Sequence, residues 1–229
     1  MAITIVTSPE TILMTELSTL KRELSLDSVD GARDAYLSDL IAQGTDFIRQ
    51  YTNRNFALTT YRETLQANYP IRPWMILTHT PIVSITGVSF NGSTVSSTTY
   101  TVEDADAGLV FREDGWTSSQ IYDYYIERQP TNWGRKLWSF TYQAGYVTPC
   151  MGSSNGDRTL PYDLERACID LCKWRYNQSG DFNPGIKRQR TGDASEEYFG
   201  TLDDSGGFIP PSIKTLLDSY VRVYVSYNR

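Results

Sequence analysis

The stretch that decides the fold is ARDAYLSDLIAQGTDFIRQYT, residues 32–52. Its apolar or small residues recur every three or four positions, the spacing of one side of an α-helix: Leu37, Leu40, Ile41, Gly44, Phe47, Ile48 and Tyr51. Gly44 falls on this apolar side, where the missing side chain lets a second helix approach closely. The stretch therefore predicts a long amphipathic helix that packs against another helix.

Weaker helical patterns lie on either side of this stretch. Before it, Leu17, Leu20 and Leu24 form one apolar stripe, with Thr7 or Thr15 as the candidate cap. After it, a helix is expected to begin near Pro161 and to bury residues at helical spacing: Leu164, Ala167, Cys168, Leu171 and Cys172. A short last helix follows Pro211 and carries Ile213, Leu216, Leu217 and Tyr220.

Between residues 57 and 146 the pattern changes to that of strands. Stretches rich in Thr, Tyr and β-branched residues alternate with turn residues, and strands are predicted over 58–66, 74–78, 81–90, 99–103, 108–112, 121–127 and 136–142. Asn91 followed by Gly92 is the strongest hairpin signal in the chain. The region is predicted to form a compact β module.

Two features stand out near the C-terminus. Residues 178–208 form a long polar stretch, well beyond the usual loop length of about 12–15 residues, which indicates a functional segment or one that orders on a partner. Residues 221–227 alternate as Val-Arg-Val-Tyr-Val-Ser-Tyr, which is typical of a strand. Such a strand can pair with a sheet edge, on another subunit for example.

These patterns predict an α+β fold, a helical core with a β-rich insertion and a C-terminal strand. Residues 1–56 form the first helical part, residues 57–148 the insertion, and residues 149–229 the second helical part with its long loop. The two helical parts are expected to pack together as one core.

The amino-acid composition excludes several classes of function. The 229 residues include 21 Lys and Arg against 27 Asp and Glu, a net charge of −6, which argues against a protein that wraps DNA. One histidine and three cysteines are too few for most zinc sites and Ser-His-Asp triads. We therefore expect that the protein is not an enzyme and that it binds neither a metal ion nor a cofactor. Tyr outnumbers Phe by 16 to 8, which favours partly wet contact surfaces.

The residues that most often carry chemistry have plain structural interpretations here. His79 lies between two predicted strands and is interpreted as structural rather than as a base. Cys168 and Cys172 are interpreted as core thiols rather than metal ligands. Residues 103–108 lack the oxygen ligands of a calcium loop and predict a turn between strands. No signal peptide and no membrane span are predicted, so we expect a protein made in a cytoplasm.

One dense basic cluster lies in the long polar stretch, formed by Lys187, Arg188 and Arg190. It is either a solvated run of charges or a contact for phosphates or an acidic protein surface. Three charges give a weak contact alone, but a ring of copies would present them many times over.

The order of these features resembles that of the head–tail connector proteins of tailed bacteriophages, also called adaptor or head-completion proteins. The matching stretches are residues 37–56 (LSDLIAQGTDFIRQYTNRNF), 81–85 (PIVSI), 142–146 (YQAGY), 160–171 (LPYDLERACIDL) and 174–176 (WRY). Residues 186–193 with Tyr198 are similar to the family's Gly-Asp loop, and residues 209–213 to the start of its C-terminal helix.

The resemblance implies a structural virion protein with no catalytic residues. Such a protein forms a ring, generally twelve-fold, beneath the portal, seals the filled capsid and joins it to the neck or tail, while the DNA passes through the lumen. The expected contacts with the portal, with neighbouring subunits or with DNA are Lys187, Arg188, Arg190, Val221, Val223 and Val225. The expected location is the virion neck, after synthesis in the host bacterial cytoplasm, without a membrane partner.

Three alternatives stay open. The first is another ring protein of a phage neck or tail, such as a stopper or a tail terminator. The second is a carbohydrate- or receptor-binding β module that uses exposed Trp and Tyr. The third is a hydrolase with paired acids, since sequence spacing does not reveal which acids meet in space.

Overall fold

The computed structural model describes residues 2–9, 12–26, 31–66, 72–116, 137–151, 156–178, 188–191, 194–197 and 209–222. They form two compact units, each built from two separate stretches of the chain. The first, which we call the β unit, takes Met1–Glu10 and Asn55–Val147. The second, the helical unit, takes Thr11–Arg54 and Thr148–Arg229. The predicted α+β class is confirmed.

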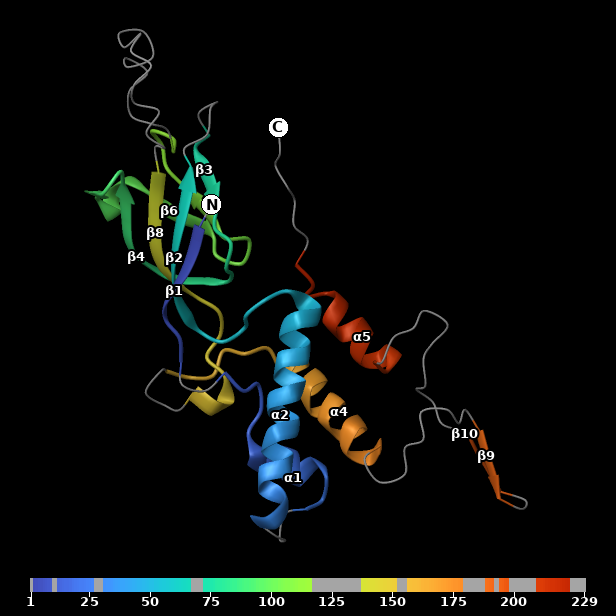
Figure 1. The fold of residues 1–229 in the computed structure, drawn as a ribbon. Coiled ribbons are helices and arrows are strands. Elements are labelled where there is room, and N and C mark those ends of the chain that lie inside the picture. The colour runs from blue at the N-terminus through green and yellow to red at the C-terminus, as the bar shows by residue number, and fades with distance from the viewer. Residues whose placement is uncertain are drawn as a thin grey trace, which may run out of the picture. The chain divides into compact units, whose positions relative to one another are not determined.

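A five-stranded antiparallel sheet is the main element of the β unit. Its strands lie in the order β1-β2-β8-β4-β5, and Figure 1 shows β1, β2, β8 and β4 side by side. Their bounds are β1 Ala2–Thr7, β2 Thr59–Gln66, β4 Ile82–Phe90, β5 Ser93–Val95 and β8 Leu137–Ala144. The central strand β8 pairs with β2 on one side and with β4 on the other, so both halves of the sheet depend on it.

A smaller sheet covers one face of the larger one. Its order is β3-β7-β6, with β3 Trp74–Ile76, β6 Thr101–Asp104 and β7 Leu109–Phe111. The core between the two sheets is aromatic: the Trp116 ring lies 5.0 Å from Trp138 and 5.1 Å from Phe140, both on β8. Val110 of β7 is completely buried in the same cluster.

The Asn91–Gly92 turn forms as predicted. It joins β4 to β5, with Phe90 opposite Ser93. Both turn residues have positive φ, 47° for Asn91 and 87° for Gly92, the conformation that this residue pair favours in a two-residue hairpin. The strands predicted over 58–66, 74–78, 81–90, 99–103, 108–112 and 136–142 correspond to β2, β3, β4, β6, β7 and β8. The one predicted over 121–127 lies outside the described residues.

The first and last residues of the inserted stretch lie side by side. The Tyr146 N–H donates to the Phe56 carbonyl at 2.7 Å, and the Leu58 N–H donates to the Tyr146 carbonyl at 2.8 Å. Gly145 has a φ of 111°, and a Cβ there would lie 2.6 Å from the Ala57 carbonyl oxygen. Only glycine permits both this conformation and this approach.

The described residues of the helical unit form the helices α1 Leu17–Glu23, α2 Gly31–Thr52, α4 Tyr162–Gln178 and α5 Pro211–Asp218. The backbone also forms a two-stranded hairpin of β9 Arg188–Thr191 and β10 Ala194–Glu197. Two short 3₁₀ turns, η1 Ser97–Thr99 in the β unit and η2 Pro149–Met151 in the helical unit, complete the described elements.

Helices α2 and α4 pack closely at Gly44. A Cβ at this position would lie 3.2 Å from the Cys172 Sγ and 3.6 Å from the Cys168 Sγ. Both thiols are free and buried, and the Cys172 Sγ donates to the Leu40 carbonyl at 3.5 Å. The structure therefore confirms the predicted close approach at Gly44 and the interpretation of the two cysteines as core residues.

Three predictions differ from the structure. Strand β1 was not predicted, and Thr7, a candidate helix cap, belongs to it, while α1 begins after Glu16 without a side-chain cap. The long polar stretch, predicted as a loop, contains the β9–β10 hairpin. It was not predicted because its two strands, RQRT and ASEE, have no alternating apolar residues. Of the strand predicted over 221–227, Val221 and Arg222 are not in a strand, and the Arg222 N–H instead donates to the Thr52 carbonyl at the end of α2, at 2.9 Å; residues 223–227 lie outside the described residues.

Gly44→Val tests the helix contact. Two methyl groups would be added where a Cβ alone is already 3.2 Å from a sulfur atom. We expect overpacking to lower the free energy of unfolding by about 1–3 kcal/mol, measured by urea denaturation. The control is Gln43→Val, on the exposed side of the same helix, which introduces the same β-branched residue and should cost only about 0.5 kcal/mol. Equal losses in the two variants would contradict the packing.

Candidate assembly surface

The structure describes only some of the predicted contact residues. Lys187, Val223 and Val225 are outside the described residues. Arg188 and Arg190 belong to strand β9, and Val221 follows α5 with 37% of its surface exposed. Their roles as contacts therefore stay predictions.

Residues that sequence analysis weighed for chemistry are held in structural contacts. The His79 ring stacks on Tyr61 with centroids 3.8 Å apart, and its backbone N–H donates to the Tyr142 hydroxyl at 3.1 Å. The Cys150 Sγ donates to the Thr15 carbonyl, and burial, with smaller effects from two nearby carboxylates, raises its pKa to about 11. A thiol with such a pKa is a poor nucleophile at neutral pH.

Acidic residues do not gather into a metal site in the part of the chain that the structure describes. Among these residues no three His, Cys, Asp or Glu lie close enough to hold an ion. The acidic stretch at 103–108 is a turn between β6 and β7, as predicted, in which the Asp104 carboxylate accepts from the Ala107 N–H at 2.8 Å. None of the described helices is long and apolar enough to span a bilayer.

One buried carboxylate was missed by sequence analysis. Glu63 on β2 has no exposed surface and accepts from the Thr78 N–H at 2.9 Å, the Thr78 hydroxyl at 2.5 Å and the Tyr142 hydroxyl at 2.6 Å. Burial, with the nearby Glu63 charge, raises the pKa of Tyr142 well above its usual range, so the hydroxyl stays a donor. The one local signal for its burial is that it shares a strand face with Tyr61 and Leu65, and its charge argues against that signal.

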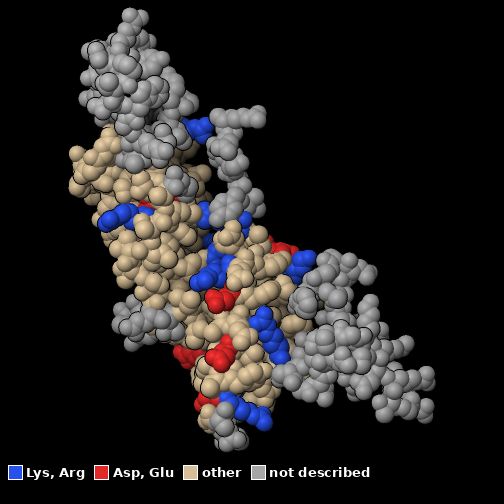
Figure 2. All heavy atoms as spheres, in the orientation of Figure 1, with Lys and Arg blue, Asp and Glu red and all other residues tan. Residues whose placement is uncertain are grey.

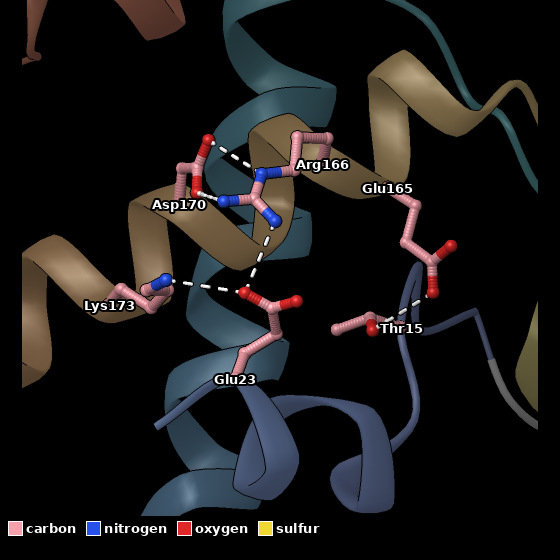
Figure 3. A network of polar contacts seen from close by, with 6 residues as sticks. All are labelled: Thr15, Glu23, Glu165, Arg166, Asp170 and Lys173. Atoms are coloured by element: carbon pink, nitrogen blue, oxygen red, sulfur yellow. Dashed lines mark hydrogen bonds and ion pairs between the residues drawn. The ribbon is translucent and has the colours of Figure 1, made fainter. Parts of the chain in front are cut away.

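A second polar cluster joins α1 to α4 in the helical unit. Figure 3 shows the Glu23 carboxylate at the end of α1 between two cations of α4, Arg166 at 3.1 Å and Lys173 at 3.3 Å. Arg166 also pairs with Asp170 one turn further along α4, at 2.9 Å. Four partly exposed side chains in fixed pairs orient two helices, and their charges are already matched.

Strand β1 is different, because its residues are apolar and exposed. All six, Ala2–Thr7, are exposed, among them Ile3 at 39%, Ile5 at 60% and Val6 at 49%. The strand carries no charged residue, and among the described strands β2 alone pairs with it. We call this strand and its unpaired side the β1 edge.

The exposed isoleucines continue the buried face of the sheet. Ile5 pairs with Tyr61 and Ile3 with Glu63, and residues directly opposite in an antiparallel pair share a face. Over β2 this face is covered, because the His79 ring stacks on Tyr61 and Thr78 binds Glu63. On the neighbouring strand β1 nothing covers this face among the described residues, and Ile3 and Ile5 are exposed to solvent.

The other sheet edges are protected in the ways that native proteins use. Strand β6 carries Glu103 and Asp104 and an irregular register. Strand β3 has only three residues and follows Pro73. Strand β5 also has three residues, and the part of β4 beyond it has two register shifts. The β1 edge has no charge, and its one irregularity follows Ile5, so it is the least protected edge.

Charge distribution agrees with this contrast. In the face that Figure 2 shows, the Lys, Arg, Asp and Glu side chains lie mainly over the helical unit. The five strands of the large sheet contain only two charged residues, the exposed Arg62 and the buried Glu63. A neutral apolar strand with an open side is a surface for pairing with another chain.

Comparison with known proteins gives a likeness of fold. No protein-family model matches the chain, and no curated protein matches it. Among solved structures, it is similar to a chain of the neck of an empty gene transfer agent (GTA) particle, computed with C6 symmetry, with a TM-score of 0.60, 16% identity and full coverage of both chains. A chain of the virion of a native GTA particle gives a TM-score of 0.57 and 17% identity, with 100% of this chain and 99% of that chain covered. The likeness of fold to these two chains thus covers the whole chain.

Glu63→Gln tests the buried carboxylate. The amide replaces one acceptor oxygen by an NH₂ group, which would face a hydroxyl or N–H donor that it cannot satisfy. We expect a loss of about 1–3 kcal/mol in the free energy of unfolding, measured by urea denaturation. Arg62→Gln, at the next position and exposed, is the control and should stay within about 0.5 kcal/mol. A Glu63→Gln variant as stable as the control would contradict the hydrogen-bond assignment.

Glu23→Gln tests the α1–α4 cluster through pH. The hydrogen bond from Lys173 and the charge of Arg166 lower the pKa of Glu23 below its ordinary value of 4.5. The carboxylate therefore stabilises the fold above pH 4.5, and this contribution is lost as the pH falls through the lowered pKa. The wild type should have a higher Tm than Glu23→Gln at pH 7, and this difference in Tm should become smaller below pH 4.5. The same series in an Arg166→Gln background should show a smaller difference in Tm, and a difference that does not change with pH would contradict the assignment.

Proposed function

We propose that the chain is a structural protein of a virion neck, a head–tail adaptor that forms a ring beneath the portal. The observation that carries this proposal is the match of fold over the whole chain to a neck chain of a GTA particle, with full coverage of both chains. The stretches that resemble phage connector proteins support it, because they run in the same order from α2 to α5.

The physical properties of the chain are consistent with this role. A ring needs a contact surface on each side of every subunit, and the β1 edge offers one that the described residues leave open. A net charge of −6 favours a lumen through which DNA slides rather than binds. Such a subunit carries out no reaction, and we propose a non-enzymatic role.

Within this proposal the ring has twelve copies, as the family resemblance implies, and each copy meets the portal on one side and a neck or tail protein on the other. We assign the cluster Lys187, Arg188 and Arg190 to the portal or to a neighbouring copy. The segment that carries Val221, Val223 and Val225 is assigned to the same class of contact. DNA passes through without specific binding.

The test is to remove the gene and examine the particles by electron microscopy. We expect capsids that package DNA but carry no tail, because nothing joins the portal to the neck. Restoring the wild-type chain should restore tailed particles, with a ring of extra density directly below the portal. Density further down the neck would indicate a stopper, and density at the end of the tail tube a tail terminator. Tailed, infectious particles without the chain would overturn the proposal.

A further inference from the structure

We propose that the β1 edge of one copy is completed by residues 223–227 of a neighbouring copy, which add a sixth strand to the sheet. This inference rests on the ring proposed above and names the contact between its subunits. It starts from the β1 edge, where Ala2–Thr7 bond to β2 on one side and have no strand on the other among the described residues.

The geometry of the β1 edge specifies what must cover it. An added strand satisfies the backbone groups on the outer side of β1, as main-chain hydrogen bonds do wherever a peptide extends a sheet. The same strand must also shield Ile3 and Ile5, whose row continues the covered face of β2. The occupant is therefore an extended segment with apolar side chains at alternate positions.

Residues 223–227, Val-Tyr-Val-Ser-Tyr, have this chemistry. Val223, Val225 and Tyr227 would share one face of a strand, and the segment carries no charge, as β1 carries none. Other short strands of the chain are unsuitable partners for a neutral edge, because β9 contains Arg188 and Arg190 and β10 contains two glutamates. The segment is also long enough to cover the regular part of β1, the four residues Ala2–Ile5 that precede the register shift between Ile5 and Thr7.

The start of the segment is fixed in the helical unit. The Arg222 N–H donates to the Thr52 carbonyl at 2.9 Å, and the Tyr51 hydroxyl donates to the Asp218 carboxylate at 2.5 Å. The hydrogen bond to Asp218 raises the pKa of Tyr51 to about 12, so this contact persists at neutral pH. Arg222, the last described residue, is therefore held at the end of α2 in the helical unit, while β1 belongs to the β unit.

Each copy thus gives a strand from one surface and receives a strand on another. A contact between two different surfaces is heterologous, and repeating it produces a closed ring when the rotation between copies closes. Pairing of β1 with β1 would instead use the same surface twice and stop at a dimer. The inferred contact has the directionality that a ring requires.

Disulfide trapping in assembled particles tests the contact. The variant carries Ile5→Cys and Val225→Cys, with Cys150→Ser to remove the partly exposed native thiol, and a second version replaces Ile3 in place of Ile5. After mild oxidation we expect at least one version to give a ladder of covalent multimers on a non-reducing gel. Chains with only one new cysteine should stay monomeric.

Several outcomes would overturn the inference. These are a disulfide within one chain, covalent dimers of the chain with Ile5→Cys alone, or intact neck rings without a ladder in either version. The last outcome leaves the ring proposal standing, because the rings are seen independently by electron microscopy. Absence of the chain from the neck would instead remove the proposed function itself.

Charge substitution gives a second readout without new cysteines. Ile5→Lys places a charge on the β1 edge, and we expect at least a tenfold loss of neck assembly with unchanged thermal unfolding of the free chain. Val83→Lys is the matched control, because Val83 is 57% exposed against 60% for Ile5 and lies on the bulged strand β4. Deleting residues 223–229 should give the same loss as Ile5→Lys, with no further loss when the two are combined. Normal assembly of Ile5→Lys, or equal losses in both lysine variants, would contradict the contact.

Discussion

The pairing of residues 56–58 with residues 145 and 146 is the constraint on which the rest of the molecule depends. It brings the first and last residues of a long β insertion to one place, through two backbone hydrogen bonds and a glycine that no side chain can replace. Because the insertion starts and ends together, the helices that precede and follow it in sequence, α2 and α4, can pack on each other at Gly44. The inserted stretch thus permits two separate cores, an aromatic one between the two sheets and an aliphatic one between the helices.

The polar groups of the chain are divided by location. Inside the β unit, Glu63 is held by three donors and replaces what would otherwise be an apolar position under β2. In the helical unit, charges are matched in pairs between α1 and α4. The edge strand β1 has no charged residue, and its neutral β-branched residues Ile3, Ile5 and Val6 are exposed to solvent. A lysine on an edge strand is a common protection against pairing with other chains, and none of the six residues of β1 provides one.

The helices and most strands were predictable because their signals are local. The 3.6-residue stripe of residues 32–52 and the Asn91–Gly92 turn each determine their structure within one stretch of sequence. Strand β1 was missed because both of its faces are apolar or small and its partner, β2, lies more than fifty residues further on, so no local alternation marks it. The burial of Glu63 depends on Thr78 and Tyr142, which other strands bring to it, and a charged residue in a Thr-rich strand otherwise indicates exposure. Assembly surfaces of this kind are visible only after the cover over each sheet row is known.

Strand order also has a consequence during synthesis. The ribosome delivers β1 first, yet its partner β2 follows only at Thr59–Gln66, and the central strand β8 emerges only at Leu137–Ala144. Throughout that interval the nascent chain displays a charge-free, β-branched segment that neighbouring nascent chains can bind. The helical unit needs chain from both sides of the insertion, and the β unit needs both its first ten residues and the strand β8, so neither is complete before β8 has been made. We expect the yield of native protein to depend on temperature and on chaperones in the producing cell. The β1 edge, which we propose as an assembly contact, would then be the main site of aggregation during synthesis.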